Sequence, residues 1–148
     1  MFLKMFRIDC YQPTFFILGS EMNFNASIKN YIADDIAAKT ANPSAHKIIE
    51  EVLKDLKKNM ETLAYSLDNE PVVSSMKSNS FSKSLTAIYI LQSSLNFEDG
   101  KEIAENLYNI YEFCKQGIMK GFMKKNSKFI YDAIPPIDEI LDSWKQIK

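Results

Sequence analysis

The sequence predicts an all-α protein, an antiparallel four-helix bundle with a short additional N-terminal helix. After Met22, apolar residues recur at three-four spacing, and no sustained alternation of strand type interrupts them. Hydrophobic residues make up 46% and charged residues 25% of the chain, which is typical of globular proteins that bury a core. Because 148 residues fall within the size of one domain, we expect a single helical bundle over residues 22–148.

Residues 1–21 have a different pattern, in which aromatic residues alternate with charges and Pro13. The apolar part is interrupted and no small-residue cleavage site follows, so the segment does not read as a signal peptide. We expect an N-terminal extension that is disordered or lies upstream of a true start at Met22. The alternative is an apolar arm that packs on the bundle.

The first predicted helix, residues 27–39, is short and peripheral. The second begins at Asn42-Pro43, because an asparagine cap followed by proline is a typical helix start, and it runs to about Leu67. Its apolar stripe comprises Ile48, Ile49, Val52, Leu53, Leu56, Met60 and Leu63.

Residues 68–80, with Pro71 and four serines, predict a loop before the third helix. Asp99 and Glu102 then resemble a capping box at the start of a fourth helix that extends to about residue 125. The apolar residues of the third helix are Leu85, Ile88, Tyr89, Leu91 and Leu95.

A fifth helix is predicted over residues 128–148, capped by Asn126-Ser127. We expect it to bend at Pro135-Pro136, because each proline removes a backbone donor and clashes with the preceding turn.

Composition argues against several classes of function. The net charge of −1 and the pI near 5.9 disfavour a nucleic-acid partner. The only histidine, His46, is expected to be structural, and a di-iron carboxylate bundle would need two Glu-x-x-His motifs. The four glycines form no phosphate loop. We therefore expect no enzyme, no cofactor and no metal.

The two cysteines, Cys10 and Cys114, show no CxxC spacing, which is typical of a reducing cytoplasm. We expect Cys114 to be a small core residue. No apolar run approaches the roughly 18 residues of a membrane span, so no membrane insertion is expected.

The fourth helix carries more apolar residues than one buried face needs, which is a stripe of about 100°. Tyr108, Met119 and Phe122 lie on its flank, either covered by the N-terminal segments or forming a groove for a partner helix. Gly117 and Gly121 indicate close approach of a neighbouring helix, or else such a groove. The predicted core seam comprises Ile103, Leu107, Ile110, Cys114 and Ile118.

Residues 95–113 read LNFEDGKEIAENLYNIYEF, and this segment resembles the signature of the FliS family of flagellar export chaperones. Thr40-Ala41-Asn42-Pro43, Trp144-Lys145 and Tyr31 resemble further family positions. The residues after Pro43 and the pair Pro135-Pro136 depart from the family pattern, as in a divergent member.

The resemblance implies a bacterial cytoplasmic chaperone that binds the disordered C-terminal segment of flagellin, prevents premature polymerisation and assists flagellar type III export. It also implies contact with the export apparatus or with regulators. The alternative is a bundle that sequesters another protein of the flagellar pathway. Partner contacts are expected at Ala104, Tyr108, Tyr111, Met119 and Phe122, with Tyr31 as a candidate lid.

Overall fold

The computed structural model describes residues 45–69 and 74–147, and all regular elements in these ranges are helices. The predicted extension 1–21 and the predicted helix 27–39 lie outside the described residues. None of the described helices is long and apolar enough to cross a membrane. The helices are α2 (Ala45–Asp68), α3 (Ser74–Ser93), α4 (Phe97–Lys124), α5 (Lys128–Tyr131) and α6 (Ile134–Gln146).

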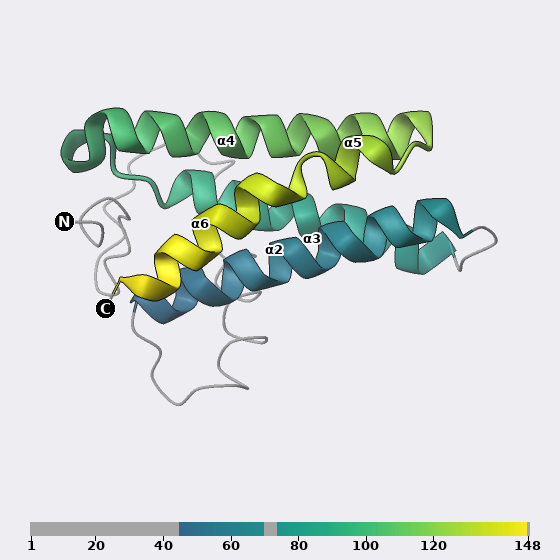
Figure 1. Cartoon of the computed structure of the whole chain (residues 1–148), viewed down its shortest axis with the longest axis horizontal. Helices are drawn as coiled ribbons and strands as arrows, with labels where there is room; N and C mark the ends of the chain where they lie inside the picture. The colour runs from purple at the N-terminus through teal and green to yellow at the C-terminus, as the bar shows by residue number, and fades with distance from the viewer. Residues whose placement is uncertain (1–44, 70–73, 148) are drawn as a thin grey trace, which may run out of the picture.

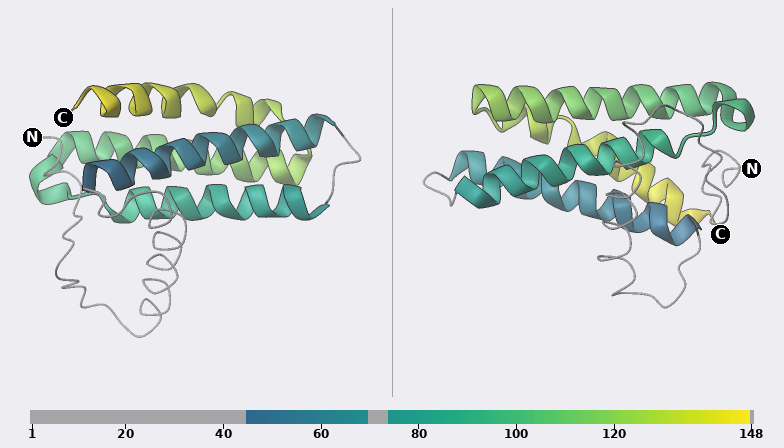
Figure 2. Two further views of the ribbon diagram at one scale, coloured as in Figure 1. Left: turned by 90° about the horizontal axis from the view of Figure 1, so that it is seen from below. Right: turned by 180° about the vertical axis from the view of Figure 1, so that it is seen from behind.

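Four long helices alternate in direction, with α2 and α4 running one way and α3 and α6 the other (Figure 1). Around the bundle, α2 packs against α3 and α6, while α4 packs against α3 and, at its far end, against α5. The two further views show the same layers from below and from behind (Figure 2). The predicted antiparallel four-helix bundle is thus confirmed for the described residues.

Helix α2 confirms the predicted stripe. All seven of its apolar stripe residues are buried, and they form one continuous core with residues of the other helices. Its solvent face carries ion pairs at three- and four-residue spacing, such as Lys54 with Glu50 at 2.6 Å. The largest fully buried side chains of the described bundle are Trp144, Tyr111, Ile49, Leu53, Leu56, Met60, Leu63, Ile88, Leu91, Ile118, Ile130 and Ile137.

Helix α3 begins at Ser74, so the predicted loop over residues 68–80 was too long. Two of its hydroxyl side chains bond within the helix: Ser84 Oγ donates to the Ser80 carbonyl at 2.7 Å, and Thr86 Oγ1 donates to the Ser82 carbonyl at 2.9 Å. Phe81 stacks on Phe122 of α4, with ring centroids 4.1 Å apart. Tertiary packing therefore overrides the weak local propensity of this serine-rich segment.

The start of α4 is capped by Asn96, and the predicted capping box at Asp99 was wrong. Asn96 Oδ1 accepts from the amides of Glu98 at 3.0 Å and Asp99 at 3.3 Å. The Asp99 carboxylate instead accepts from Asn96 Nδ2 at 2.9 Å. Lys101, at φ 43° and ψ −123°, then interrupts the first turn.

The predicted fifth helix is divided into two helices, and the division lies before the two prolines, which corrects the predicted bend. The helix stops at Tyr131, and α6 starts at Ile134 with Pro135 and Pro136 in its first turn. A proline is tolerated there because the first amides of a helix have no partner within it. Of the predicted cap Asn126-Ser127, Ser127 occupies the N-cap position of α5 without a side-chain cap hydrogen bond, and Asn126 Oδ1 accepts from the Lys128 amide at 3.0 Å.

Two contacts hold the ends of the bundle together. His46 at the start of α2 stacks on Trp144 of α6, with ring centroids 4.8 Å apart. The two residues also exchange hydrogen bonds: His46 Nε2 donates to the Trp144 carbonyl, and Trp144 Nε1 donates to the His46 carbonyl, both at 2.9 Å. At the other end, a Cβ on Gly117 would lie 2.8 Å from the Phe129 carbonyl oxygen. The glycine thus permits close approach of α5.

Candidate protein-binding surfaces

Helix α4 exposes more large apolar side chains than any other described helix. A helix needs only one apolar stripe to join the core, so these residues are surplus to folding. They are Phe97 at 48%, Ile103 at 46%, Tyr108 at 39%, Phe113 at 53%, Met119 at 41% and Met123 at 76% exposure.

The buried face of α4 differs in part from the predicted seam. Leu107, Cys114 and Ile118 are buried as expected, whereas Ile103 is exposed and Ile110 is half-buried. The centre of the buried face is rotated by about 30–40° from the predicted seam, so that Ala104 and Tyr111 take the inward positions predicted for Ile103 and Ile110. These two residues are fully buried core residues in this structure and are not part of an exposed face.

Two polar groups on this buried face are closed to solvent chemistry. Cys114 Sγ donates to the Ala133 carbonyl at 3.3 Å, and burial raises the pKa of the thiol to about 12. Burial, with a smaller contribution from Cys114, also raises the pKa of Tyr111. Its hydroxyl has no hydrogen-bond partner among the described residues. Across residues 45–69 and 74–147, no group of three His, Cys, Asp or Glu side chains could hold a metal ion.

The first candidate surface lies where α3 and α4 run side by side. The Phe81–Phe122 stack and a hydrogen bond from Gln92 to Glu112 fix the antiparallel register of the two helices. This register brings exposed or half-buried apolar residues of both helices to one side of the bundle. We call this side the α3/α4 face; it comprises Phe81, Leu85, Tyr89, Tyr108, Met119 and Phe122.

A polar bridge divides the α3/α4 face into two apolar parts. Gln92 Nε2 donates to Glu112 Oε1 at 2.9 Å, and Lys115 pairs with the same carboxylate. Both partners lower the pKa of Glu112, and the hydrogen bond from Lys115 has a larger effect than the hydrogen bond from Gln92. Tyr108 lies on one side of the bridge, where its ring meets that of Phe97 edge to face, with ring centroids 6.1 Å apart. Met119 lies on the other side.

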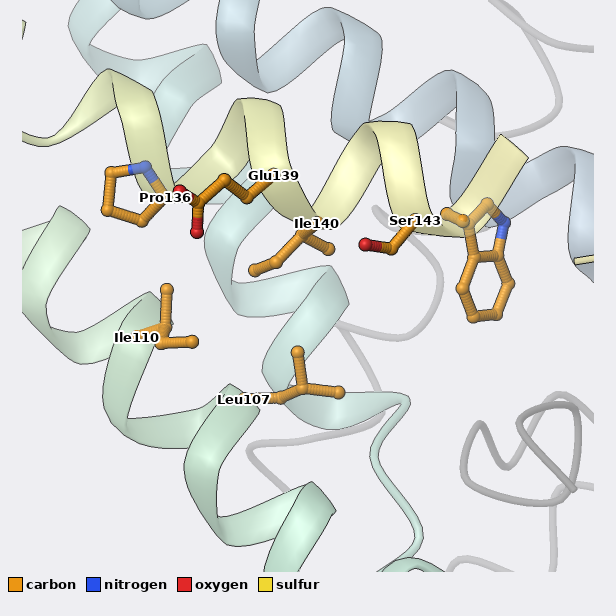
Figure 3. A pocket seen from close by; sticks show the side chains of 7 residues that line it. Leu107, Ile110, Pro136, Glu139, Ile140 and Ser143 are labelled. Carbon is orange, nitrogen blue, oxygen red and sulfur yellow. The ribbon is translucent and has the colours of Figure 1, made fainter. Parts of the chain in front are cut away.

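The second candidate surface is a pocket between α4 and α6, about 240 Å³ in volume. Helix α6 slants away from α4 toward the start of α2, as Figure 1 shows, and this divergence opens the pocket. Leu107 and Ile110 enter it from α4, facing the side chains of α6 (Figure 3). The α6 residues are Pro136, Glu139, Ile140, Ser143 and Trp144.

The structure brings three of the five expected partner-binding residues together: Tyr108, Met119 and Phe122 all lie on the α3/α4 face. The candidate lid residue, Tyr31, lies outside the described residues. Sequence reasoning missed the pocket, because it placed Leu107 and Ile110 in a closed seam. Their periodicity carries no signal of where α6 diverges.

Known proteins resemble this chain over most of its length. The family model described as Flagellar protein FliS matches residues 25–148. The chain is 29% identical over 123 residues to the flagellar secretion chaperone FliS of Vibrio cholerae, covering 82% of this chain and 88% of that protein. It is 24% identical over 123 residues to the flagellar secretion chaperone FliS of Salmonella typhimurium, covering 82% and 90%.

Proposed function

Because the chain belongs to the FliS family, we propose that it is a flagellar export chaperone that binds the C-terminal segment of flagellin in the cytoplasm before export. The observation that carries the proposal is the surplus of exposed apolar side chains on α4. The secretion-chaperone names of the two relatives support the flagellar context. The choice of flagellin as the bound protein is our proposal.

A chaperone for a disordered segment must offer a long apolar surface. Ordering each backbone residue costs about 1–2 kcal/mol, so the segment folds on its carrier only if enough apolar area is buried. The α3/α4 face meets this need along the helix axis. From Tyr108 to Phe122, at a rise of about 1.5 Å per residue, it spans roughly 21 Å. That length matches a partner helix of about four turns.

The proposed mechanism is helix-in-groove binding. An amphipathic segment of flagellin would lay apolar side chains against Tyr108 on one side of the polar bridge and against Met119 and Phe122 on the other. The Glu112 carboxylate at the centre would favour a polar residue of the partner at mid-helix. While the segment is held, its apolar side chains are covered, which prevents them from joining other flagellin subunits.

The test measures binding of the C-terminal segment of the flagellin from the same genome, by calorimetry. Tyr108→Asp and Met119→Asp should each weaken binding by about 2 kcal/mol, the size of an interface hot spot. Both side chains are partly exposed, so thermal unfolding should stay within about 0.5 kcal/mol of the wild type.

Phe113→Asp is the matched control. Phe113 is at least as exposed, but it points about 140° round α4 from Tyr108 and lies off the α3/α4 face. Its substitution should leave the affinity unchanged. Equal loss of binding for all three variants would remove the α3/α4 face as the docking site. Failure to bind flagellin, together with binding of another flagellar protein, would favour a sequestering regulator.

A further inference from the structure

The α4/α6 pocket lies on the opposite flank of α4 from the α3/α4 face. Ile110, which lines the pocket, points about 160° round the helix from Tyr108. A partner segment lying on the α3/α4 face therefore leaves the pocket open. The pocket needs an occupant of its own.

The size of the pocket matches a side chain. An apolar cavity of about 150 Å³ can hold benzene, and pockets for small-molecule ligands start near 300 Å³. At about 240 Å³, this pocket suits one branched aliphatic side chain and its backbone. The inner wall is apolar: Leu107 and Trp144 are almost fully buried, and Ile110 and Ile140 are half-buried.

The charge at the pocket selects the kind of segment that enters. Glu139 is the only charged residue that lines it. The other α6 carboxylates have partners within the bundle: Asp138 pairs with Lys57 at 2.5 Å, and Asp142 with Lys145 at 3.9 Å. Within the described parts of the chain, Glu139 makes no ion pair. A lysine or arginine that approaches the pocket would meet this carboxylate.

We propose that the α4/α6 pocket is a second anchor for the exported partner, which inserts an aliphatic side chain between Ile110 and Ile140 and places a lysine or arginine beside Glu139. The inference rests on the proposed function. A segment held on both flanks of α4 gains from effective concentration, because the second contact forms within the complex. Two anchors thus hold one chain more tightly than the α3/α4 face alone.

Trp144 supplies a direct readout. It is the only tryptophan of the chain and forms part of the pocket wall. The indole is already shielded from bulk water, so an aliphatic side chain that fills the pocket acts on it by direct contact, and the Trp144 emission should shift when the flagellin C-terminal segment binds. The Tyr108→Asp variant, at saturating segment concentration, should show the same shift, because its pocket is unchanged.

Charge reversal at Glu139 tests the basic residue of the partner. Glu139→Lys should weaken binding of the flagellin segment about tenfold, and Glu139→Gln about threefold with loss of the wild-type salt dependence. Asp142→Lys is the matched control, since it makes the same charge change on α6 away from the pocket. It should stay within about twofold of the wild type. Ser143→Phe, which fills the pocket from its rim, should weaken binding at least as much as Glu139→Lys.

The outcomes separate the two proposals. If the wild-type protein does not bind the segment, the proposed function fails, and this inference fails with it. If binding depends on Tyr108 while Trp144 emission and Glu139→Lys affinity stay unchanged, only the pocket assignment is overturned. Emission that changes on dilution alone would assign the pocket to a second copy. If the Ile32→Asp variant, without partner, differs from the wild type in Trp144 emission, the pocket would be assigned to the segment of this chain that precedes α2. Either of these last two results overturns the inference.

Discussion

Helices α2 and α4 are both long and amphipathic, yet they use their surfaces differently. Of the large apolar side chains on α2, only Tyr65 is exposed, whereas α4 exposes six. The side of α2 away from the core carries a network of lysine and glutamate pairs around Glu50. Helix α4 instead presents aromatic and methionine side chains to solvent on both flanks.

The difference separates residues that fold the chain from residues available to a partner. Every apolar residue of the α2 stripe is needed to close the core. On α4, the buried face already joins the core, so the apolar residues that remain 39–76% exposed are not required to close it. Exposed apolar side chains that gather on one helix are typical of interaction surfaces, and this makes α4 the helix on which function is proposed to depend.

The sharpest test of this separation uses two adjacent residues of α4. Ile118 is fully buried, and Met119 is 41% exposed. Ile118→Asp buries an unpaired charge, so it should cost about 4 kcal/mol or more, a large part of the roughly 5–15 kcal/mol that stabilises a domain. Met119→Asp should change the free energy of unfolding by less than about 0.5 kcal/mol. Urea unfolding followed by circular dichroism measures both.

Leu56→Asp extends the comparison to α2, where it should destabilise the protein as much as Ile118→Asp does. A large loss of stability for Met119→Asp would show that the α3/α4 face is part of the core. The division between folding and binding residues on α4 would then be wrong.

The second test concerns the packing of α4 against α5. At Gly117 this contact is made through the backbone, whereas α2 packs through its side chains. A Cβ on Gly117 would lie 2.8 Å from the Phe129 carbonyl oxygen and 3.1 Å from Ala133 Cβ. Gly117→Ala gains roughly 1 kcal/mol of helix propensity, but overpacking against backbone should cost about 1–3 kcal/mol. We expect a net destabilisation of about 1 kcal/mol in thermal unfolding.

The exposed neighbour provides the control for Gly117. Gln116→Ala changes propensity without a new contact and should stay within about 0.5 kcal/mol of the wild type. A stabilising Gly117→Ala would show that α5 can move away from α4, and that the close approach is not required.

The bundle was predictable because helical periodicity is local. The stripe of α2 and the buried Leu107, Cys114 and Ile118 of α4 could be read from spacing alone. The start of α3 could not, since Ser74–Ser80 has no local helix signal and forms a helix through packing such as that of Phe81 on Phe122. The proline break was anticipated, but its position depended on whether the prolines end one helix or begin the next.

The candidate site was predictable only in part, for the same reason. Tyr108, Met119 and Phe122 were placed on one flank by periodicity, and the structure brings them together with α3. The burial of Ala104 and Tyr111 depends on the exact rotation of α4 against the core. A small rotation about the helix axis would bury the neighbouring Ile103 and Ile110 in their place. The α4/α6 pocket depends on the slant of α6, a property of how helices pack and not of either helix alone.

The third test uses pH, because the buried face of α4 carries titratable groups. The folded-state pKa of Cys114 is raised from 9.0 to about 12. A raised pKa means that the stabilising contribution is complete below pH 9 and is lost as the pH rises toward 12. Stability should therefore fall by about 1.4 kcal/mol per pH unit across this window. Tyr111, also raised, should add to the fall above pH 10.

Urea unfolding at pH 8, 9, 10 and 11 measures this slope, and Cys114→Ala is the comparison. The variant should be less stable at pH 8, but its stability should fall less steeply between pH 9 and pH 10. Parallel slopes for the two proteins would contradict the burial of the thiol.

The smallest expected effect distinguishes the C-terminal ends of the two helices. Helix α4 ends at Lys124, and the residue that caps it, the exposed Lys125, has φ 50° and ψ 43° and donates its amide to the Gly121 carbonyl. The left-handed conformation costs an L-residue about 1–2 kcal/mol and costs glycine almost nothing. Lys125→Gly should therefore stabilise the protein by up to about 1 kcal/mol, after the entropic cost of glycine, and raise Tm by about 3 °C.

Asn69, just beyond the end of α2, is the matched control, because only Lys101 and Lys125 have positive φ among the described non-glycine residues. Asn69→Gly gains no relief of strain and loses the Asn69 side-chain bond to the Tyr65 carbonyl at 2.9 Å, so Tm should fall. Opposite signs in calorimetric melts would support a left-handed turn at the end of α4 alone. If both variants lower Tm, Lys125 does not adopt that turn in solution, and the packing of α5 beneath Gly117 and Gly121 must be set by the contacts at Phe129 and Ile130 instead.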